Sequence, residues 1–89
     1  PKIEYWVGVT YYQKGKYALS QEAFTQLLTD HPTCQYVPKA LLGLADAADY
    51  NHDWEAAKAA LERYLEEYPD AKEAPGAKKQ LELLRYQHQ

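Results

Sequence analysis

The chain has 89 residues, of which 46% are hydrophobic and 26% charged, a balance typical of one small globular domain. Its single cysteine excludes an internal disulfide framework and any zinc site made of several cysteines. The net charge of −3 argues against nucleic acid as the main partner, and no apolar run is long enough to span a membrane.

All prolines of the chain fall on one register. Pro1, Pro38 and Pro75 are spaced by 37 residues, and Pro32 and Pro69 are also 37 residues apart. A fixed period of this length indicates stacked structural repeats. The predicted organisation is two units and a partial third copy, which span residues 1–37, 38–74 and 75–89.

Each unit is predicted to form two helices, because apolar residues recur at helical spacing between turn signals. The predicted helices run from Lys2 to about Lys14, from Tyr17 to Asp30, from Tyr36 to Tyr50, from Trp54 to Tyr68, and from about Ala71 or Pro75 to Tyr86. Asp70 followed by Glu73 predicts a capping box at the start of the last helix. No segment alternates with a period of two, so no strand is expected.

The repeated residues resemble the tetratricopeptide repeat (TPR). In the first unit they read Val7-Gly8-x₂-Tyr11, then Ser20-x₃-Phe24 and Pro32, and in the second Leu44-Ala45-x₂-Ala48, then Ala57-x₃-Leu61 and Pro69. The resemblance implies an all-α fold, a short right-handed superhelical solenoid of five helices. It also implies a non-catalytic module that binds other proteins.

The linker between the second unit and the third resembles the linkers of one group of TPR proteins. The string Tyr68-Pro69-Asp70-Ala71-x₂-Ala74-Pro75 is similar to linkers of bacterial envelope TPR proteins. These include the periplasmic coordinator of the Tol-Pal system and the TPR lipoproteins of outer-membrane assembly. The resemblance therefore implies a periplasmic or cell-envelope protein, with a cytoplasmic TPR protein as the alternative.

The two ends of the array differ in polarity. On the fifth helix Lys78, Glu82 and Arg85 stand where the second unit has apolar residues, so we expect a polar cap that ends the array near residue 89. Ile3, Thr10 and Tyr17 are predicted to form an apolar edge at the other end. A preceding segment or a second copy of the chain would cover that edge, which makes self-association the alternative function.

Catalysis, metal binding and a cofactor are not expected. Asp46, Asp49, His52 and Asp53 form the densest titratable cluster, and their spacing matches no strong zinc or calcium pattern. We interpret the cluster as a solvated acidic edge. The cysteine, Cys34, lies in a linker, where a lone thiol is more often incidental than functional.

A concave groove is the predicted binding site. TPR proteins bind peptides or helices with inward-facing residues of their first helices, and the register maps these to one set of positions. The predicted partner-binding residues are Tyr5, Val9, Tyr12, Gln13, Leu42, Asp46, Asp49, Tyr50, Lys79, Leu83 and Tyr86. Chaperone-binding TPR proteins hold a C-terminal carboxylate with lysines and asparagines, whereas the matching positions here are Tyr5, Val9, Leu42 and Asp46, so no carboxylate clamp is expected. Residues 38–74 carry a net charge of −5, against 0 for residues 1–37 and +2 for residues 75–89, so an apolar or mildly basic protein segment is the expected partner.

Overall fold

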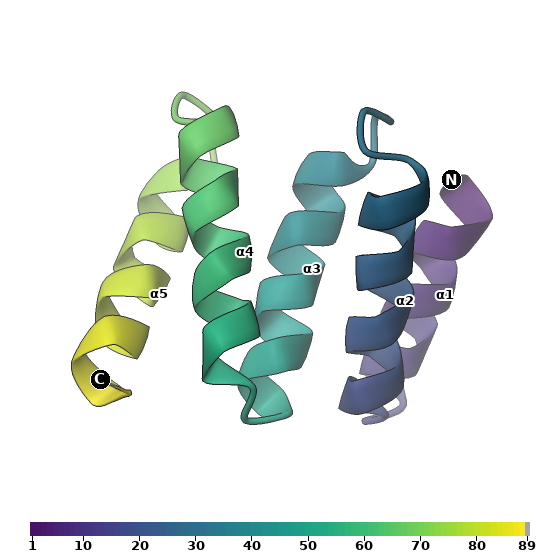
Figure 1. Ribbon diagram of the computed structural model, residues 1–89, viewed down its shortest axis with the longest axis horizontal. Helices are drawn as coiled ribbons and strands as arrows, with labels where there is room; N and C mark the ends of the chain where they lie inside the picture. Colours follow the sequence, from purple (N-terminus) through teal and green to yellow (C-terminus); the bar gives the residue numbers. More distant parts are fainter. Residues whose placement is uncertain (89) are drawn as a thin grey trace.

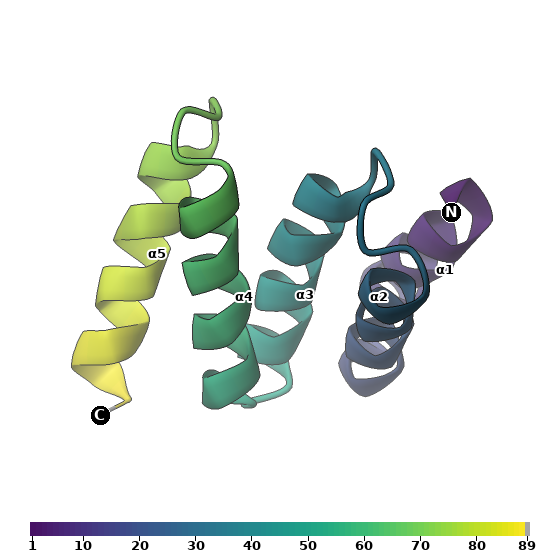
Figure 2. The same cartoon turned by 45° about the horizontal axis from the view of Figure 1, so that its top comes forward.

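Five helices in antiparallel succession make up the described part of the chain, residues 1–88 of a computed structural model (Figure 1). They are α1 (Lys2–Gln13), α2 (Tyr17–Asp30), α3 (Val37–Tyr50), α4 (Trp54–Glu67) and α5 (Ala74–Gln87). Each helix packs on its neighbours in the sequence, and α1 also touches α3. Figure 2 shows the same succession from α1 to α5 in a second view. The all-α, TPR-like fold and its five helices are confirmed, and residues 1–88 contain no strand.

Turns and prolines set the helix boundaries. Pro38 and Pro75 stand at the second residue of α3 and α5, where a missing N–H group costs no helical hydrogen bond. The α1–α2 turn contains Gly15 at φ 75°, and the α3–α4 turn contains His52 at φ 60°. These two residues are 37 positions apart. The repeat therefore includes the backbone conformation of the turns, because each helix pair has one residue with a positive φ at the same position.

The start of α5 corrects one prediction. The predicted capping box of Asp70 and Glu73 is wrong, because Glu73 itself is the residue before the helix and its side chain makes no capping hydrogen bond. Instead the Ala74 N–H donates to the Ala71 carbonyl at 3.0 Å, and the Ala77 N–H donates to the Glu73 carbonyl at 2.9 Å. The linker thus enters α5 through a backbone turn, without a capping side chain.

The core runs along the array, between the helices. Its largest fully buried side chains include Phe24 of α2, Leu41 of α3, and Leu61 and Tyr64 of α4. Small residues of α3 and α4 let the helices approach closely; those with 4% exposure or less include Ala45, Ala48, Ala57 and Ala60. In the first pair the buried Ser20 hydroxyl donates to the Gly8 carbonyl at 2.7 Å, so this buried polar side chain has its partner.

None of the helices in residues 1–88 combines the length and the apolar character that crossing a membrane requires.

Candidate functional site: the hollow between α1 and α3

A hollow of about 250 Å³ opens between α1 and α3, with one α2 side chain at its base. Its lining residues are Tyr5, Val9, Tyr12, Phe24, Lys39, Leu42, Gly43 and Asp46. Most of these side chains are apolar or aromatic, and one acid and one base stand among them. Apolar walls with a few polar groups are typical of ligand-binding pockets.

Helical spacing brings these side chains together. On α1, Tyr5, Val9 and Tyr12 are four and then three residues apart and therefore share one face. On α3, Leu42 and Asp46 are one turn apart and face them. These five residues are among the eleven predicted for partner binding, and the structure places all five around one hollow.

Three residues of the hollow were missed by the sequence analysis: Phe24, Lys39 and Gly43. Phe24 belongs to a second helix, whose residues were not expected to reach the groove. Gly43 leaves the space that the Phe24 ring fills, because a β carbon there would lie 2.7 Å from Phe24 Cζ. Gly8 on α1 faces the same ring, so a pair of glycines flanking one aromatic residue is the signal that would have revealed it.

A second aromatic contact borders the hollow at Tyr5. Its ring stacks on Tyr36, with centroids 5.2 Å apart and planes 23° apart. It also lies 5.9 Å from the Phe24 ring. Tyr5 is thereby held between the core and the linker that precedes α3, which limits its rotamers before any ligand arrives.

The other end of the groove is a cluster of three tyrosines. Tyr17 stacks on Tyr50, with centroids 4.8 Å apart and planes 17° apart, and the edge of Tyr12 meets both rings. Tyr50 was predicted for the groove, and it is 58% exposed. Large rigid rings that carry a hydroxyl group are favourable contact residues in protein interfaces.

Tyr17 therefore does not stand with Ile3 and Thr10 at the outer edge of α1, where the sequence analysis placed it. The first residue of a second helix lies beside the last turn of the following first helix, so Tyr17 reaches across to Tyr50. The next unit repeats the contact, since Trp54 stacks on His88 at 3.7 Å and 9°. Ile3 and Thr10 do lie together, in a different hollow on α1.

The acidic residue of the hollow, Asp46, has a pKa above its ordinary value. Burial raises the pKa of Asp46, the hydrogen bond from Gln80 opposes that rise, and the nearby Asp49 carboxylate adds to it. The Gln80 amide of α5 donates to Asp46 Oδ1 at 3.3 Å. Asp46 is therefore a partly desolvated carboxylate that a cationic group of a ligand would stabilise.

The same surroundings shift the pKa of Tyr12. Its pKa is raised to about 12, first by burial and then by the charge of Asp46 and by its contacts with Tyr50 and Tyr17. The Tyr12 hydroxyl therefore keeps its proton to a higher pH than an ordinary tyrosine.

The other predicted groove residues lie outside the hollow. Gln13 is exposed at the end of α1, and Asp49 is half-buried one turn beyond Asp46 on α3. On α5, Lys79 is exposed, Leu83 is 52% exposed and Tyr86 is 81% exposed. These α5 side chains lie at helical spacing on one face, and none of them lines the hollow.

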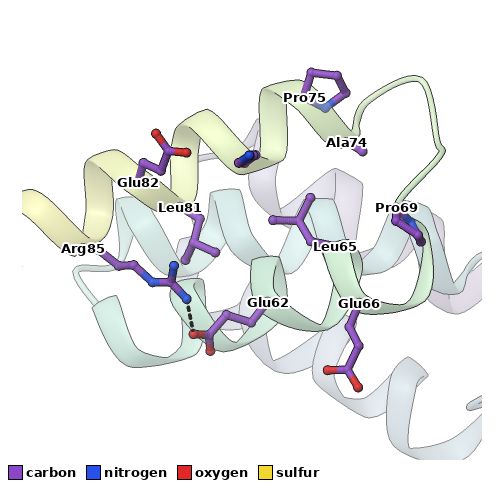
Figure 3. Close-up of a pocket in the computed structure, with 10 residues that line it drawn as sticks. Glu62, Leu65, Glu66, Pro69, Ala74, Pro75, Leu81, Glu82 and Arg85 are labelled. Carbon is purple, nitrogen blue, oxygen red and sulfur yellow. Dashed lines mark hydrogen bonds and ion pairs between the residues drawn. The ribbon is translucent and has the colours of Figure 1, made fainter.

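A larger, more polar hollow of about 930 Å³ lies between α4 and α5 (Figure 3). Leu65 and Leu81 lie between the two helices, and Arg85 reaches from α5 to Glu62 of α4, with Nη2 and Oε2 2.8 Å apart. The charged residues that predicted a polar cap, Lys78, Glu82 and Arg85, all line this hollow and are exposed.

The acidic cluster of the α3–α4 turn is used structurally. Asp53 Oδ1 accepts from the Ala56 N–H at 3.2 Å at the start of α4, and Asp53 Oδ2 accepts from the Gln21 side-chain amide at 2.6 Å. In the described part of the chain, no group of three or more His, Cys, Asp or Glu side chains is arranged to hold a metal ion.

A known protein family matches most of the chain. The family model of YfiO, described as an outer membrane lipoprotein, matches residues 1–79. The chain belongs to the YfiO family. A comparison with curated proteins gave no match. Together with the TPR-like fold, the family identifies a bacterial cell-envelope type of helical-repeat protein, in agreement with the resemblance found in the sequence.

Proposed function

We propose that the chain is a non-catalytic interaction module that binds an extended or helical protein segment in the hollow between α1 and α3. The observation that carries this proposal is the convergence of Tyr5, Tyr12 and Leu42 around a partly desolvated carboxylate, Asp46. Membership of the YfiO family, a family of outer membrane lipoproteins, supports a role at the outer membrane. We further propose a periplasmic location and a part in assembling envelope proteins.

The chemistry of the hollow selects the ligand. Apolar or aromatic side chains of a partner would contact Val9, Leu42 and the Phe24 ring, which contribute favourable burial. A lysine or arginine would approach Asp46, where a positive charge relieves the desolvation of the carboxylate. Lys39 at the border would disfavour a second basic residue beside it.

The proposal can be tested with peptides selected from a random library on the immobilised wild-type chain. Affinity is then measured by fluorescence anisotropy for the wild type and for a variant that combines Asp46→Lys with Asp49→Lys. We expect the variant to lose at least about tenfold in affinity, because a positive charge replaces a negative one in the hollow. Circular dichroism should report unchanged helicity.

A matched control has the same change in net charge elsewhere. Glu22→Lys combined with Glu66→Lys changes two exposed carboxylates on α2 and α4, outside the hollow. This control should bind the selected peptides like the wild type. Equal losses in both variants, or no loss in the first, would contradict binding in the hollow. Val9→Glu offers an independent variant that blocks the hollow without altering Asp46.

A further inference from the structure

The two walls of the hollow between α1 and α3 share one spacing. On α1 the lining residues, four and then three positions apart, are Tyr5, Val9 and Tyr12. On α3 the lining residues span the same seven positions and are Lys39, Leu42, Gly43 and Asp46. Contacts at intervals of three, four and seven residues are those by which an amphipathic helix lies in a groove.

Opposite charges stand at the two ends of the α3 wall. Lys39 is exposed in the first turn of α3, and Asp46 lies two turns further on. Among residues 1–88, neither takes part in an ion pair. The side-chain partner of Asp46 is the neutral Gln80 amide, which reaches Oδ1. The hollow therefore offers a ligand one place for a cation and another for an anion.

The distance between the two charges selects a helical ligand. The α carbons of Lys39 and Asp46 are separated by seven residues of one helix, or about 10 Å. In a strand, the side chains on one face are about 6.6 Å or about 13 Å apart. In a polyproline II segment they are about 9 Å apart, but the residues between them point elsewhere. A helix alone presents a basic, an apolar and an acidic side chain on one face over this length.

The middle of the hollow receives the apolar side chain. Val9 of α1 and Leu42 of α3 stand at its sides, and Phe24 lies at its base. Its volume of about 250 Å³ is below the roughly 300–1,000 Å³ of pockets that enclose a whole small molecule. A side chain of the ligand therefore enters the hollow, while the ligand backbone stays outside.

Helix dipoles determine the direction of the ligand. The helices α1 and α3 run the same way, because successive helices are antiparallel (Figure 1). An antiparallel ligand helix brings its partly positive N-terminus beside the partly negative C-termini of both. In that direction the ligand residue opposite Asp46 precedes the residue opposite Lys39. A parallel helix would place like ends together and would need the reverse order of charges.

We propose that the hollow between α1 and α3 binds an amphipathic helix of a partner protein that runs antiparallel to α3. This helix has a basic residue opposite Asp46, an apolar residue one turn later, and an acidic residue opposite Lys39 two turns later. The inference rests on the function proposed for this hollow, and it specifies the conformation, the direction and the charge order of the ligand.

The test uses synthetic peptides of equal length as probes. The base-first peptide has arginine, then leucine one helical turn later, then glutamate two turns later. The acid-first peptide exchanges the arginine and the glutamate, and two further peptides have arginine at both places or glutamate at both places. Fluorescence anisotropy measures each Kd. We expect the base-first peptide to bind at least about tenfold more tightly than each of the others.

A proline peptide tests the helical conformation separately. Proline is placed on the solvent side of the base-first sequence, so the three contact side chains stay while the helix is broken. This peptide should also lose at least about tenfold in affinity. Equal binding of the proline peptide would show that the ligand is extended and would overturn the inference.

Exchange of the two charges in the protein gives the sharpest comparison. A variant with Lys39→Asp and Asp46→Lys keeps the net charge and should prefer the acid-first peptide. Lys39→Glu alone changes an exposed residue and should prefer the peptide with two arginines, which provides a test that leaves Asp46 in place. Lys16→Glu with Glu22→Lys exchanges two exposed charges outside the hollow and should rank the peptides as the wild type does.

The outcomes separate this inference from the function on which it rests. Equal binding of the base-first and acid-first peptides, or no binding of any of them up to about 1 mM, would overturn the inference. The proposed function would survive if library-selected peptides still required Asp46, and it would fall as well if they did not. Sedimentation velocity should give a monomer. A concentration-dependent dimer abolished by Val9→Glu would assign the hollow to a second copy of the chain and overturn the inference.

Discussion

The ring of Phe24 occupies the space that a side chain on Gly43 would need, since an ideal β carbon on Gly43 would lie 2.7 Å from Phe24 Cζ. This contact fixes how closely α2 and α3 approach. It also forms part of the hollow between α1 and α3, so the packing of the core and the shape of the candidate site depend on the same pair.

Gly43→Ala should therefore destabilise the fold by about 1–3 kcal/mol, because the added methyl group overpacks a rigid ring. Urea unfolding followed by circular dichroism measures the change. Gly76→Ala is the matched control, because nothing lies within 4 Å of a β carbon at that exposed helical position. The control should gain up to about 1 kcal/mol from helix propensity. A Gly43→Ala chain as stable as the Gly76→Ala chain would refute the close contact.

Asp53 should contribute to stability through the start of α4. Asp53→Ala removes the acceptor for the Ala56 N–H and for the Gln21 amide, so we expect a loss of about 1–2 kcal/mol in the free energy of unfolding. Asp53→Asn keeps an oxygen acceptor and should lose less.

Asp70→Ala is the control for Asp53. Asp70 precedes α5 and supplies no cap to it, so its removal should change the free energy of unfolding by less than about 0.5 kcal/mol. A large effect of Asp70→Ala would argue for a capping box, in conflict with the uncapped start of α5.

The raised pKa of Asp46 predicts a pH-dependent gain from Asp46→Asn. An acid whose pKa is higher in the folded state than in the unfolded state destabilises the fold once it is ionised, and the cost disappears as the pH falls through the folded-state pKa. At neutral pH, Asp46→Asn should therefore unfold at a higher urea concentration than the wild type. Below the ordinary carboxyl pKa of 3.8 the two should unfold alike. A difference that persisted in acid would point to packing and not to charge.

Tyr12 predicts a second pH dependence, at the alkaline end. In the unfolded chain Tyr12 ionises near its ordinary pKa of 10.0, whereas the folded chain holds the proton until about 12. Folded stability should fall as the pH rises through this window, since the unfolded state releases its proton first. Tyr12→Phe removes the ionisable group and should flatten that part of the wild-type curve. Urea midpoints across the window, with Tyr11→Phe as the control, measure the difference.

The repeat register explains why the helices could be predicted. Prolines on one register, together with the turn residues Gly15 and His52, mark the ends of helices through local backbone geometry, which depends on nearby sequence. The start of α5 was harder, because the linker enters it through a backbone turn that does not depend on a capping side chain. Asp70 and Glu73 have the side chains of a cap without the geometry of one.

The hollow was predictable in part for a similar reason. Helical spacing decides which side chains share a face, so Tyr5, Val9 and Tyr12 could be grouped from their positions alone. Spacing does not decide how far a side chain reaches into the next unit, and for that reason Tyr17 was assigned to the wrong neighbours. The role of Gly43 was missed because the register aligns it with Trp6, a residue of opposite size.

The succession of the helices affects how the chain unfolds. Because helix contacts join mainly sequence neighbours, most native contacts form between residues close in the chain. Such topologies fold quickly, and loss of one terminal helix need not disrupt the rest. Hydrogen exchange should accordingly vary along the array, with slow amides in α3, which is packed on both sides, and faster amides in α5. A partner bound at either end would slow exchange there before it changed the middle.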